Sequence, residues 1–269
     1  MSINKDNEAK TLNLSDGRKL GYSEFGEPTG KPLFHFHGYP GSRLEGRIIN
    51  LVAVSRDVRF ISVDRPGMGL SDFKQNRTII EWPNDVAELA DSLQINQFAV
   101  EGVSGGGPYS LACAYKIPDR LTHVGVLSGV DPHWDPGKPW TRPLNKNDAE
   151  EFWRKFSNIM SEPDKKLVLN PRLLEVLTEE LYEAFRQGDG GVAYERELYR
   201  KDWGFRLDDI SPTVKVHLWH GKLDVNVPFT MGSNMARAIP NCDARFYSEE
   251  GHYSTVLNHL EEITKTLTA

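Results

Sequence analysis

The sequence contains little cysteine and no long hydrophobic run. Its 269 residues include only two cysteines, Cys113 and Cys242, which are too few for a disulfide framework or a cysteine-based metal site. We expect two buried, reduced thiols, which are typical of a cytoplasmic protein. No segment approaches the roughly 18 apolar residues of a membrane-spanning helix, so we expect no membrane span.

Positive charge is also scarce and scattered. The chain has 32 Lys and Arg against 38 Asp and Glu, a net charge of −6, and no basic stripe, which argues against nucleic acid as a partner. Residues 1–8 are polar and contain no apolar signal core, which predicts a cytoplasmic protein rather than an exported one. The glycine-rich turns at 67–69 and 105–107 complete no dinucleotide-binding or phosphate-binding pattern, so we expect no nucleotide cofactor.

One pair of histidines has the spacing of metal ligands. His35 and His37 lie two residues apart in a predicted strand, where their side chains would share a face. No downstream Asp-His pair accompanies them, and His37 also belongs to a motif described below. We therefore expect no metal and no other cofactor.

The order of predicted elements indicates the fold class. Apolar segments that read as strands alternate with segments of helical spacing. This alternation predicts an α/β fold with a mostly parallel sheet and helices on both faces. The strands are expected at 11–14, 19–25, 32–36, 58–63, 98–100, 123–128, 214–219 and 244–247, and the helices at 79–93, 108–115, 231–238 and 255–267.

The alternation stops after Asp131, where prolines mark an irregular connection, and a charged, mostly helical stretch follows at 147–199. We expect a core domain of residues 1–131 and 209–269 and a helical cap subdomain of residues 132–208. The cap would lie over the carboxyl ends of the strands, where open α/β sheets bind ligands. Its many aromatic residues could form an apolar substrate wall or pack the cap onto the sheet: Trp134, Trp140, Phe152, Trp153, Phe156, Tyr182, Phe185, Tyr194, Tyr199, Trp203 and Phe205.

The pentapeptide GVSGG at residues 102–106 is the most informative motif. It follows a predicted strand and precedes a predicted helix, the context in which G-x-S-x-G forms a nucleophile elbow. Such a turn holds the serine in a strained conformation with its hydroxyl clear of the sheet. The N–H groups of the next helix favour negative charge there. We predict Ser104 as the nucleophile.

A serine nucleophile needs a base and a carboxylate that orients the base. His252 follows the last predicted strand in a loop, whereas the other histidines have plausible structural explanations. We predict His252 as the base and Asp224, just past the penultimate strand, as the orienting acid. Asp131, one strand earlier, is the alternative acid.

An oxyanion needs two N–H donors. The backbone N–H of Gly105, directly after the nucleophile, is the first candidate. The second is the backbone N–H of Tyr39, in the loop after a strand, where Pro40 cannot donate and flanking glycines allow a tight turn.

Three glutamates of the cap could hold a substrate amine, as an aminopeptidase requires. Glu179, Glu180 and Glu183 lie close together in a helical segment. We expect them to form a solvated helix face.

The chain resembles the α/β-hydrolase superfamily, of the serine-nucleophile, cap-containing esterase type, over about residues 10–269. The resemblance implies a catalytic triad in the chain order Ser, Asp, His. Epoxide hydrolases and haloalkane dehalogenases of similar outline carry Asp as the nucleophile, so Ser104 argues against both. Gly105 replaces the Trp that usually follows the serine in prolyl iminopeptidases. The motifs are HGYPG at 37–41, DRPGMGLS at 64–71, GVSGG at 102–106, Asp224 with Pro228, and Gly251-His252.

These features predict a carboxylesterase-like serine hydrolase. It would cleave a small or medium ester, thioester or lactone through an acyl-enzyme intermediate. An aminopeptidase, a carbon–carbon bond hydrolase or a lyase could use the same triad, and a small-molecule receptor could use the same fold.

Overall fold

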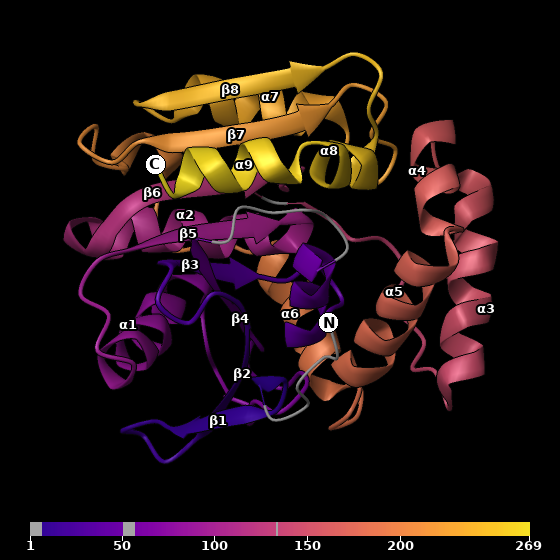
Figure 1. Ribbon diagram of the computed structural model, residues 1–269, viewed down its shortest axis with the longest axis horizontal. Coiled ribbons are helices and arrows are strands. Elements are labelled where there is room, and N and C mark those ends of the chain that lie inside the picture. The colour runs from indigo at the N-terminus through magenta and orange to yellow at the C-terminus, as the bar shows by residue number, and fades with distance from the viewer. Residues whose placement is uncertain (1–6, 51–56, 133) are drawn as a thin grey trace.

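The computed structural model describes residues 7–50, 57–132 and 134–269. Most of the polar N-terminal segment, residues 1–6, and His133 therefore lie outside the described residues. Within these ranges eight strands form one sheet in the order β1-β2-β4-β3-β5-β6-β7-β8 (Figure 1). Strand β2 is antiparallel to β1 and β4, and every other neighbouring pair is parallel. The strands are β1 (Lys10–Asn13), β2 (Lys19–Gly26), β3 (Lys31–Phe36), β4 (Val58–Val63), β5 (Phe98–Val103), β6 (Leu121–Leu127), β7 (Val216–Gly221) and β8 (Cys242–Tyr247).

The central strands are apolar on both sides because helices cover both faces of the sheet. In β3, Leu33 belongs to one buried hydrophobic cluster, whereas Phe34 and Phe36 belong to the other. This alternation follows from the two-residue period of a strand. The two clusters are the two halves of the core, one on each face.

The helices divide between these two clusters. Buried residues of α1 (Trp82–Ser92), α2 (Gly107–Lys116) and α7 (Phe229–Ala238) belong to the first cluster. The second contains residues of α8 (His252–Asn258) and α9 (Leu260–Leu267), together with Ile49 of the 3₁₀ segment η2 (Arg43–Asn50). Short 3₁₀ segments η3 (Ile79–Glu81), η4 (Ser104–Gly106) and η5 (Pro118–Arg120) lie between these elements. The α/β architecture expected from the element order, a mostly parallel sheet with helices on both faces, is therefore confirmed.

Two local predictions are wrong. The expected helix at 255–267 is divided at His259 into α8 and α9. His252, expected in a loop, is the first residue of α8. The prediction failed because the capping residue of this helix start comes from a distant part of the chain, as described below.

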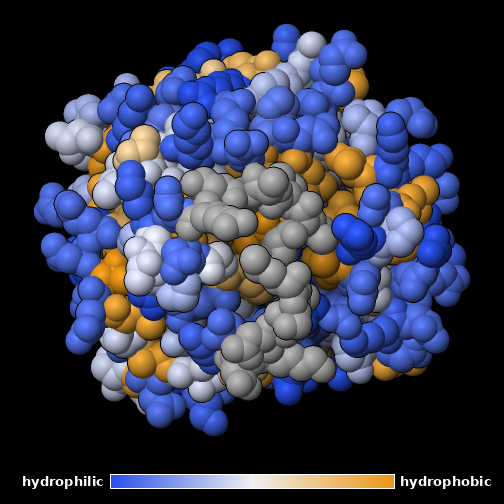
Figure 2. Space-filling view, viewed as in Figure 1, coloured by the Kyte–Doolittle hydropathy of each residue, from blue (hydrophilic) through white to orange (hydrophobic). Residues whose placement is uncertain are grey.

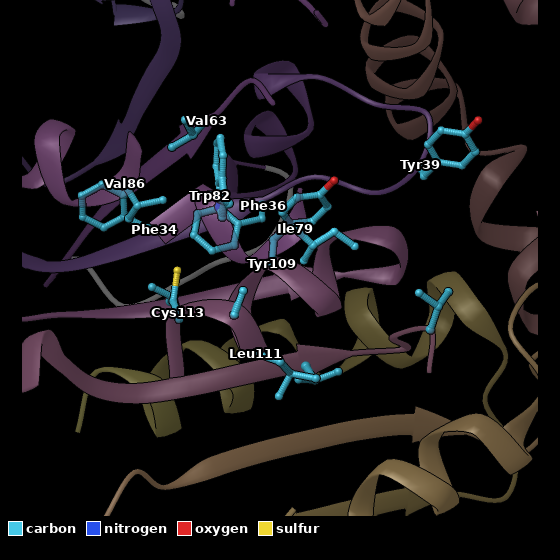
Figure 3. Packing of buried hydrophobic residues seen from close by; sticks show 14 of the residues in the cluster. Phe34, Phe36, Tyr39, Val63, Ile79, Trp82, Val86, Tyr109, Leu111 and Cys113 are labelled. Carbon is cyan, nitrogen blue, oxygen red and sulfur yellow. The ribbon is translucent and has the colours of Figure 1, made fainter. Parts of the chain in front are cut away.

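The aromatic packing between β3, α1 and α2 is dense. Figure 3 shows aromatic rings of β3, α1 and α2 in contact: Phe36 meets Trp82 edge-on at a centroid distance of 5.4 Å, and Trp82 meets Tyr109 at 5.8 Å. Tyr39 lies apart from this group (Figure 3), and its hydroxyl donates to the carbonyl of Val192 at 3.0 Å. Tyr39 thus extends from the sheet toward helix α6 (Gly190–Tyr199).

The long connection between β6 and β7 is helical, and we call its residues 132–208 the helical insertion. It contains α3 (Lys146–Phe156), η6 (Ser157–Ile159), α4 (Glu162–Val168), α5 (Pro171–Ala184), α6 (Gly190–Tyr199) and most of η7 (Leu207–Asp209). Asn145 caps α3 by accepting the N–H of Asp148 at 3.0 Å, and Asn170 caps α5, which begins with Pro171. Helices α3, α4 and α5 stand beside the carboxyl ends of the central strands (Figure 1).

The outer surface is mainly polar. Figure 2 shows a face in which hydrophilic residues predominate and hydrophobic ones appear between them in smaller areas. Within the described residues, no helix has both the length and the apolar character needed to cross a bilayer.

Candidate active site

Ser104 occupies a sharp turn between β5 and α2. Its φ is +53°, in the left-handed region that a non-glycine residue rarely adopts. A Cβ on Gly102 would collide with the carbonyl of Gly106, and a Cβ on Gly106 would collide with the carbonyl of Phe36. Both positions therefore require glycine so that the backbone can turn this closely.

The two predicted oxyanion donors are neighbours. A Cβ built on Gly105 would lie only 2.6 Å from the Cβ of Tyr39. The hydroxyl oxygen of Tyr199, from α6, lies 2.8 Å from the carbonyl oxygen of Gly105. Gly105 is thus enclosed between the loop after β3 and the helical insertion, which leaves no room for a side chain.

His252 and Asp224 are joined by a short hydrogen bond. Nδ1 of His252 lies 2.7 Å from Oδ2 of Asp224. The other oxygen of Asp224 accepts the N–H groups of Asn226 at 2.9 Å and Val227 at 2.8 Å. Because Asp224 is fixed by its own loop, it can hold the imidazole in one orientation.

Asp131 does not meet His252. Its carboxylate instead accepts the side-chain N–H of Asn234 at 3.3 Å. Ser104 and His252 line the same cavity, although no hydrogen bond joins their side chains among the described contacts. Such a contact commonly tightens only when substrate is bound.

The helical insertion holds the start of the helix that carries His252. The two carboxylate oxygens of Asp164, in α4, accept the backbone N–H of His252 at 2.7 Å and of Ser254 at 2.8 Å. Asp164 is fully buried. These N–H groups begin α8 and have no acceptor within the helix, so a carboxylate placed there satisfies them and favours the helix dipole.

Burial alone would lower the pKa of His252. The charge and hydrogen bond of Asp224 outweigh that effect and, with smaller contributions from Asp164 and Glu45, raise the pKa above its usual value of 6.5. His252 is therefore a stronger base than a free imidazole.

These groups open into a cavity of about 500 Å³. Ser104, His252 and Tyr39 line it on the side of the sheet. Five of the aromatic residues expected in the cap also line it: Trp134, Trp140, Phe152, Trp153 and Phe156. For these five the substrate-wall interpretation fits, whereas Phe185, Tyr199, Trp203 and Phe205 are buried core residues.

The expected solvated face of glutamates is wrong for Glu180. This residue is 3% exposed and lines the cavity. Its neighbours Glu179 and Glu183 form ion pairs with basic side chains. Glu180 lines the cavity, whereas Glu179, one residue earlier in the same helix, does not. Sequence spacing alone did not distinguish these two positions.

The two histidines with metal-ligand spacing have other partners. The ring nitrogens of His35 lie 3.0 Å from Glu101 and 3.2 Å from Glu45. Nε2 of His37 accepts the N–H of Arg65 at 3.2 Å. Both rings serve to fix loops around the site.

A buried ion pair links the insertion to the core. Glu195 of α6 accepts from Arg65 at 2.7 Å and from Arg77 at 2.8 Å. Its first oxygen also accepts the hydroxyl of Tyr199 at 2.6 Å. Because the Tyr199 hydroxyl also contacts the carbonyl of Gly105, α6 is connected directly to the turn that carries Ser104.

Residues 31–258 match the α/β hydrolase fold family, and the chain belongs to that family. It is 31% identical over 124 residues to the non-heme chloroperoxidase of Streptomyces lividans, a match covering 45% of each chain. The chain thus spans about half or less of the length of the first curated relatives it matches.

Solved structures share the fold over nearly the whole length. An α/β hydrolase fold protein from Nakamurella multipartita superimposes with a TM-score of 0.79 at 19% identity, covering 97% of this chain and 98% of that one. The enol-lactonase of Burkholderia xenovorans gives a TM-score of 0.73 at 20% identity, covering 96% and 97%. At such identities the likeness concerns the fold.

Two residues of this site were missed by sequence analysis. Asp164 looks like an ordinary acidic residue in the first turn of a helix, and Glu45 stands in a segment with no recognisable pattern. Their positions depend on tertiary contacts with His252 and with Gly38, for which the sequence carries no local signal.

Proposed function

We propose that this chain is a serine hydrolase that cleaves a small or medium carboxylic ester, thioester or lactone through an acyl-enzyme intermediate. The observation that carries the proposal is a strained Ser104, with φ +53°, beside a cavity that also contains His252 bonded to Asp224 at 2.7 Å. This combination is needed for nucleophilic catalysis and has no evident structural purpose.

In the proposed mechanism, His252 removes the proton of the Ser104 hydroxyl as the oxygen attacks the substrate carbonyl. Asp224 stabilises the imidazolium that forms. The N–H groups of Gly105 and Tyr39 donate to the oxyanion. His252 then protonates the leaving group, and the same residue activates the water that releases the acid.

The helical insertion is proposed to act as a cap that shapes the acyl pocket. Its aromatic residues line the same cavity as Ser104, and esters of moderate length would gain affinity by burying alkyl groups against them. The lactonase among the structural neighbours is consistent with such substrates but concerns that protein.

The test is hydrolysis of a p-nitrophenyl ester series from acetate to decanoate, with Ser104→Ala as the control. We expect turnover that Ser104→Ala abolishes and a chain-length optimum set by the cavity. Equal rates for the wild type and Ser104→Ala, or no turnover from folded protein, would contradict the proposal.

A further inference from the structure

One side of the cavity carries two carboxyl groups that the proposed mechanism does not use. Glu45 comes from η2 and Glu180 from α5; they are 7% and 3% exposed, and both line the cavity. Glu45 lies close to the nucleophile, because a Cβ built on Gly38 would be 3.8 Å from both Oε1 of Glu45 and the Cβ of Ser104. A substrate acyl group at Ser104 would therefore lie near Glu45.

Glu45 is already ionically engaged at one oxygen. Its Oε2 accepts the N–H of Gly38 at 2.7 Å and lies 3.2 Å from Nε2 of His35. His35 is shared with Glu101, so one imidazolium faces two carboxyl groups. The second oxygen of Glu45 has no hydrogen bond among the described residues.

Glu180 has still fewer partners. Its Oε1 accepts one N–H, from Ser42, at 3.3 Å, and no lysine, arginine or histidine of the described chain forms an ion pair with its carboxylate. Burial and the nearby Glu45 raise the pKa of Glu180 well above its ordinary value. A carboxyl group in this situation favours its neutral form until a cation arrives.

The neighbouring glutamates of α5 show that this lack of a partner is specific to one position. Arg47 and Lys146 both pair with Glu179. Arg43 pairs with Glu183 at 2.7 Å. The chain thus supplies cations to the two glutamates on either side and none to the one that faces the cavity.

Aromatic rings complete the surroundings of these acids. Trp153 is on the cavity wall and meets Tyr253 edge-on at 5.9 Å, and Tyr253 also lines the cavity. Aromatic faces together with carboxyl groups are the combination that binds organic ammonium ions, because the ring quadrupole attracts the cation while methyl groups bury apolar area.

We propose that the cavity binds a substrate that carries an organic ammonium group, held by Glu180 and Glu45 against the aromatic wall while Ser104 attacks its ester carbonyl. The proposal rests on the proposed hydrolase function for the position of the scissile bond. The ammonium site itself can be tested by binding alone, without turnover.

The first test measures binding without chemistry. Titration calorimetry on Ser104→Ala uses two pairs of esters. The first pair is acetylcholine, which carries the cation in its leaving group, and its neutral tert-butyl isostere. The second pair is an ester with a trimethylammonium group in its acyl part and the corresponding tert-butyl isostere. We expect each cation to bind about tenfold more tightly than its isostere. Of the two pairs, the one with the larger ratio tells whether the leaving group or the acyl group carries the charge.

The matched variants are Glu180→Gln and Glu179→Gln in the same background. The preference for the cation should fall to near unity in Glu180→Gln and persist in Glu179→Gln, whose side chain is outside the cavity. Equal binding of cation and isostere by the parent protein, or an unchanged ratio in Glu180→Gln, would overturn the proposal. If the wild-type protein showed no esterase activity while Ser104→Ala kept the binding preference, only the hydrolase assignment would be overturned.

A second measurement follows the pH dependence of binding. Binding of the cation should release a proton as Glu180 ionises, so cation affinity should rise from acid to neutral pH while affinity for the isostere stays level. The other titratable groups near Glu180 are Glu45, Asp64, Arg65 and Tyr253, and His252 lines the same cavity. Because deprotonation of His252 would also favour a cation, the pH profile is compared with that of Glu180→Gln, in which the part due to Glu180 should disappear. Cation affinity that is independent of pH, with no proton release in buffers of different ionisation enthalpy, would contradict the role of Glu180.

Discussion

The carboxylate of Asp164, in the helical insertion, lies 2.7 Å from the backbone nitrogen of His252. This bond ties the position of the proposed base to the position of α4. The insertion therefore contributes to the geometry of the site as well as to the cavity wall.

Replacing Asp164 by Asn should lower kcat/KM for esters roughly ten- to a hundredfold, because a charge-assisted hydrogen bond to the backbone of His252 is lost. The pKa of His252 is raised by Asp224 and further by Asp164 and Glu45, against the effect of burial. Without the Asp164 charge that pKa falls, so the acid limb of the pH–rate profile should move to lower pH.

The matched control is Asp148→Asn, which removes an exposed carboxylate that accepts the N–H of Leu144 at the start of α3. It should leave the profile in place. An unmoved acid limb in Asp164→Asn, together with normal kcat, would show that this carboxylate serves stability alone.

Replacing Asp224 by Asn should reduce kcat about ten-thousandfold with the fold intact, the effect found when the orienting aspartate of a serine protease triad is replaced. The reason is that the amide cannot stabilise the imidazolium of His252. Steady-state kinetics with circular dichroism checks this outcome. Asp131→Asn is the comparison, and a large loss in that variant alone would reverse the assignment of the acid.

Much of this arrangement could be predicted from sequence. The strand, turn, helix order around residues 102–106 identifies Ser104, because each local signal agrees with the fold. The proposed base His252 and the proposed acid Asp224 follow from their places after the last two strands. The start of α8 at His252 and the buried position of Glu180 could not be predicted, since both depend on contacts with residues far away in the chain.

The protein should lose stability as pH rises from neutral toward pH 9. Burial lowers the pKa of His35, but hydrogen bonds and charges of Glu101 and Glu45 raise it to about 9. Because the pKa of His35 is higher in the folded state, its protonation stabilises the folded protein fully below its unfolded pKa of 6.5. This stabilisation is lost as the pH rises through the folded value. The contribution is on the order of 3 kcal/mol.

Urea unfolding at several pH values between 6 and 9.5, spaced about half a unit apart, measures this loss. His35→Gln should be less stable at pH 6 and show a flatter dependence. A wild-type free energy of unfolding that stays level or rises over this interval, with the same slope in His35→Gln, would refute the role given to His35.

Gly102→Ala should destabilise the protein by about 2–3 kcal/mol, because the added methyl group would collide with the backbone of Gly106 and the turn would have to shift. Gly190→Ala is the matched substitution, since a Cβ there meets nothing within 4 Å. Differential scanning calorimetry compares the two. Similar melting temperatures for both variants would mean that the turn at Ser104 is less tightly packed than its geometry implies.

The ion pairs of Glu195 limit how the helical insertion can be exchanged. Grafting the corresponding segment of another family member in place of residues 132–208 would remove this acid and leave Arg65 and Arg77 buried opposite no anion. Such an uncompensated charge costs about 3–5 kcal/mol. A working chimera would have to transplant the two arginines along with α6, so the unit of exchange between relatives extends into the core, beyond the inserted helices.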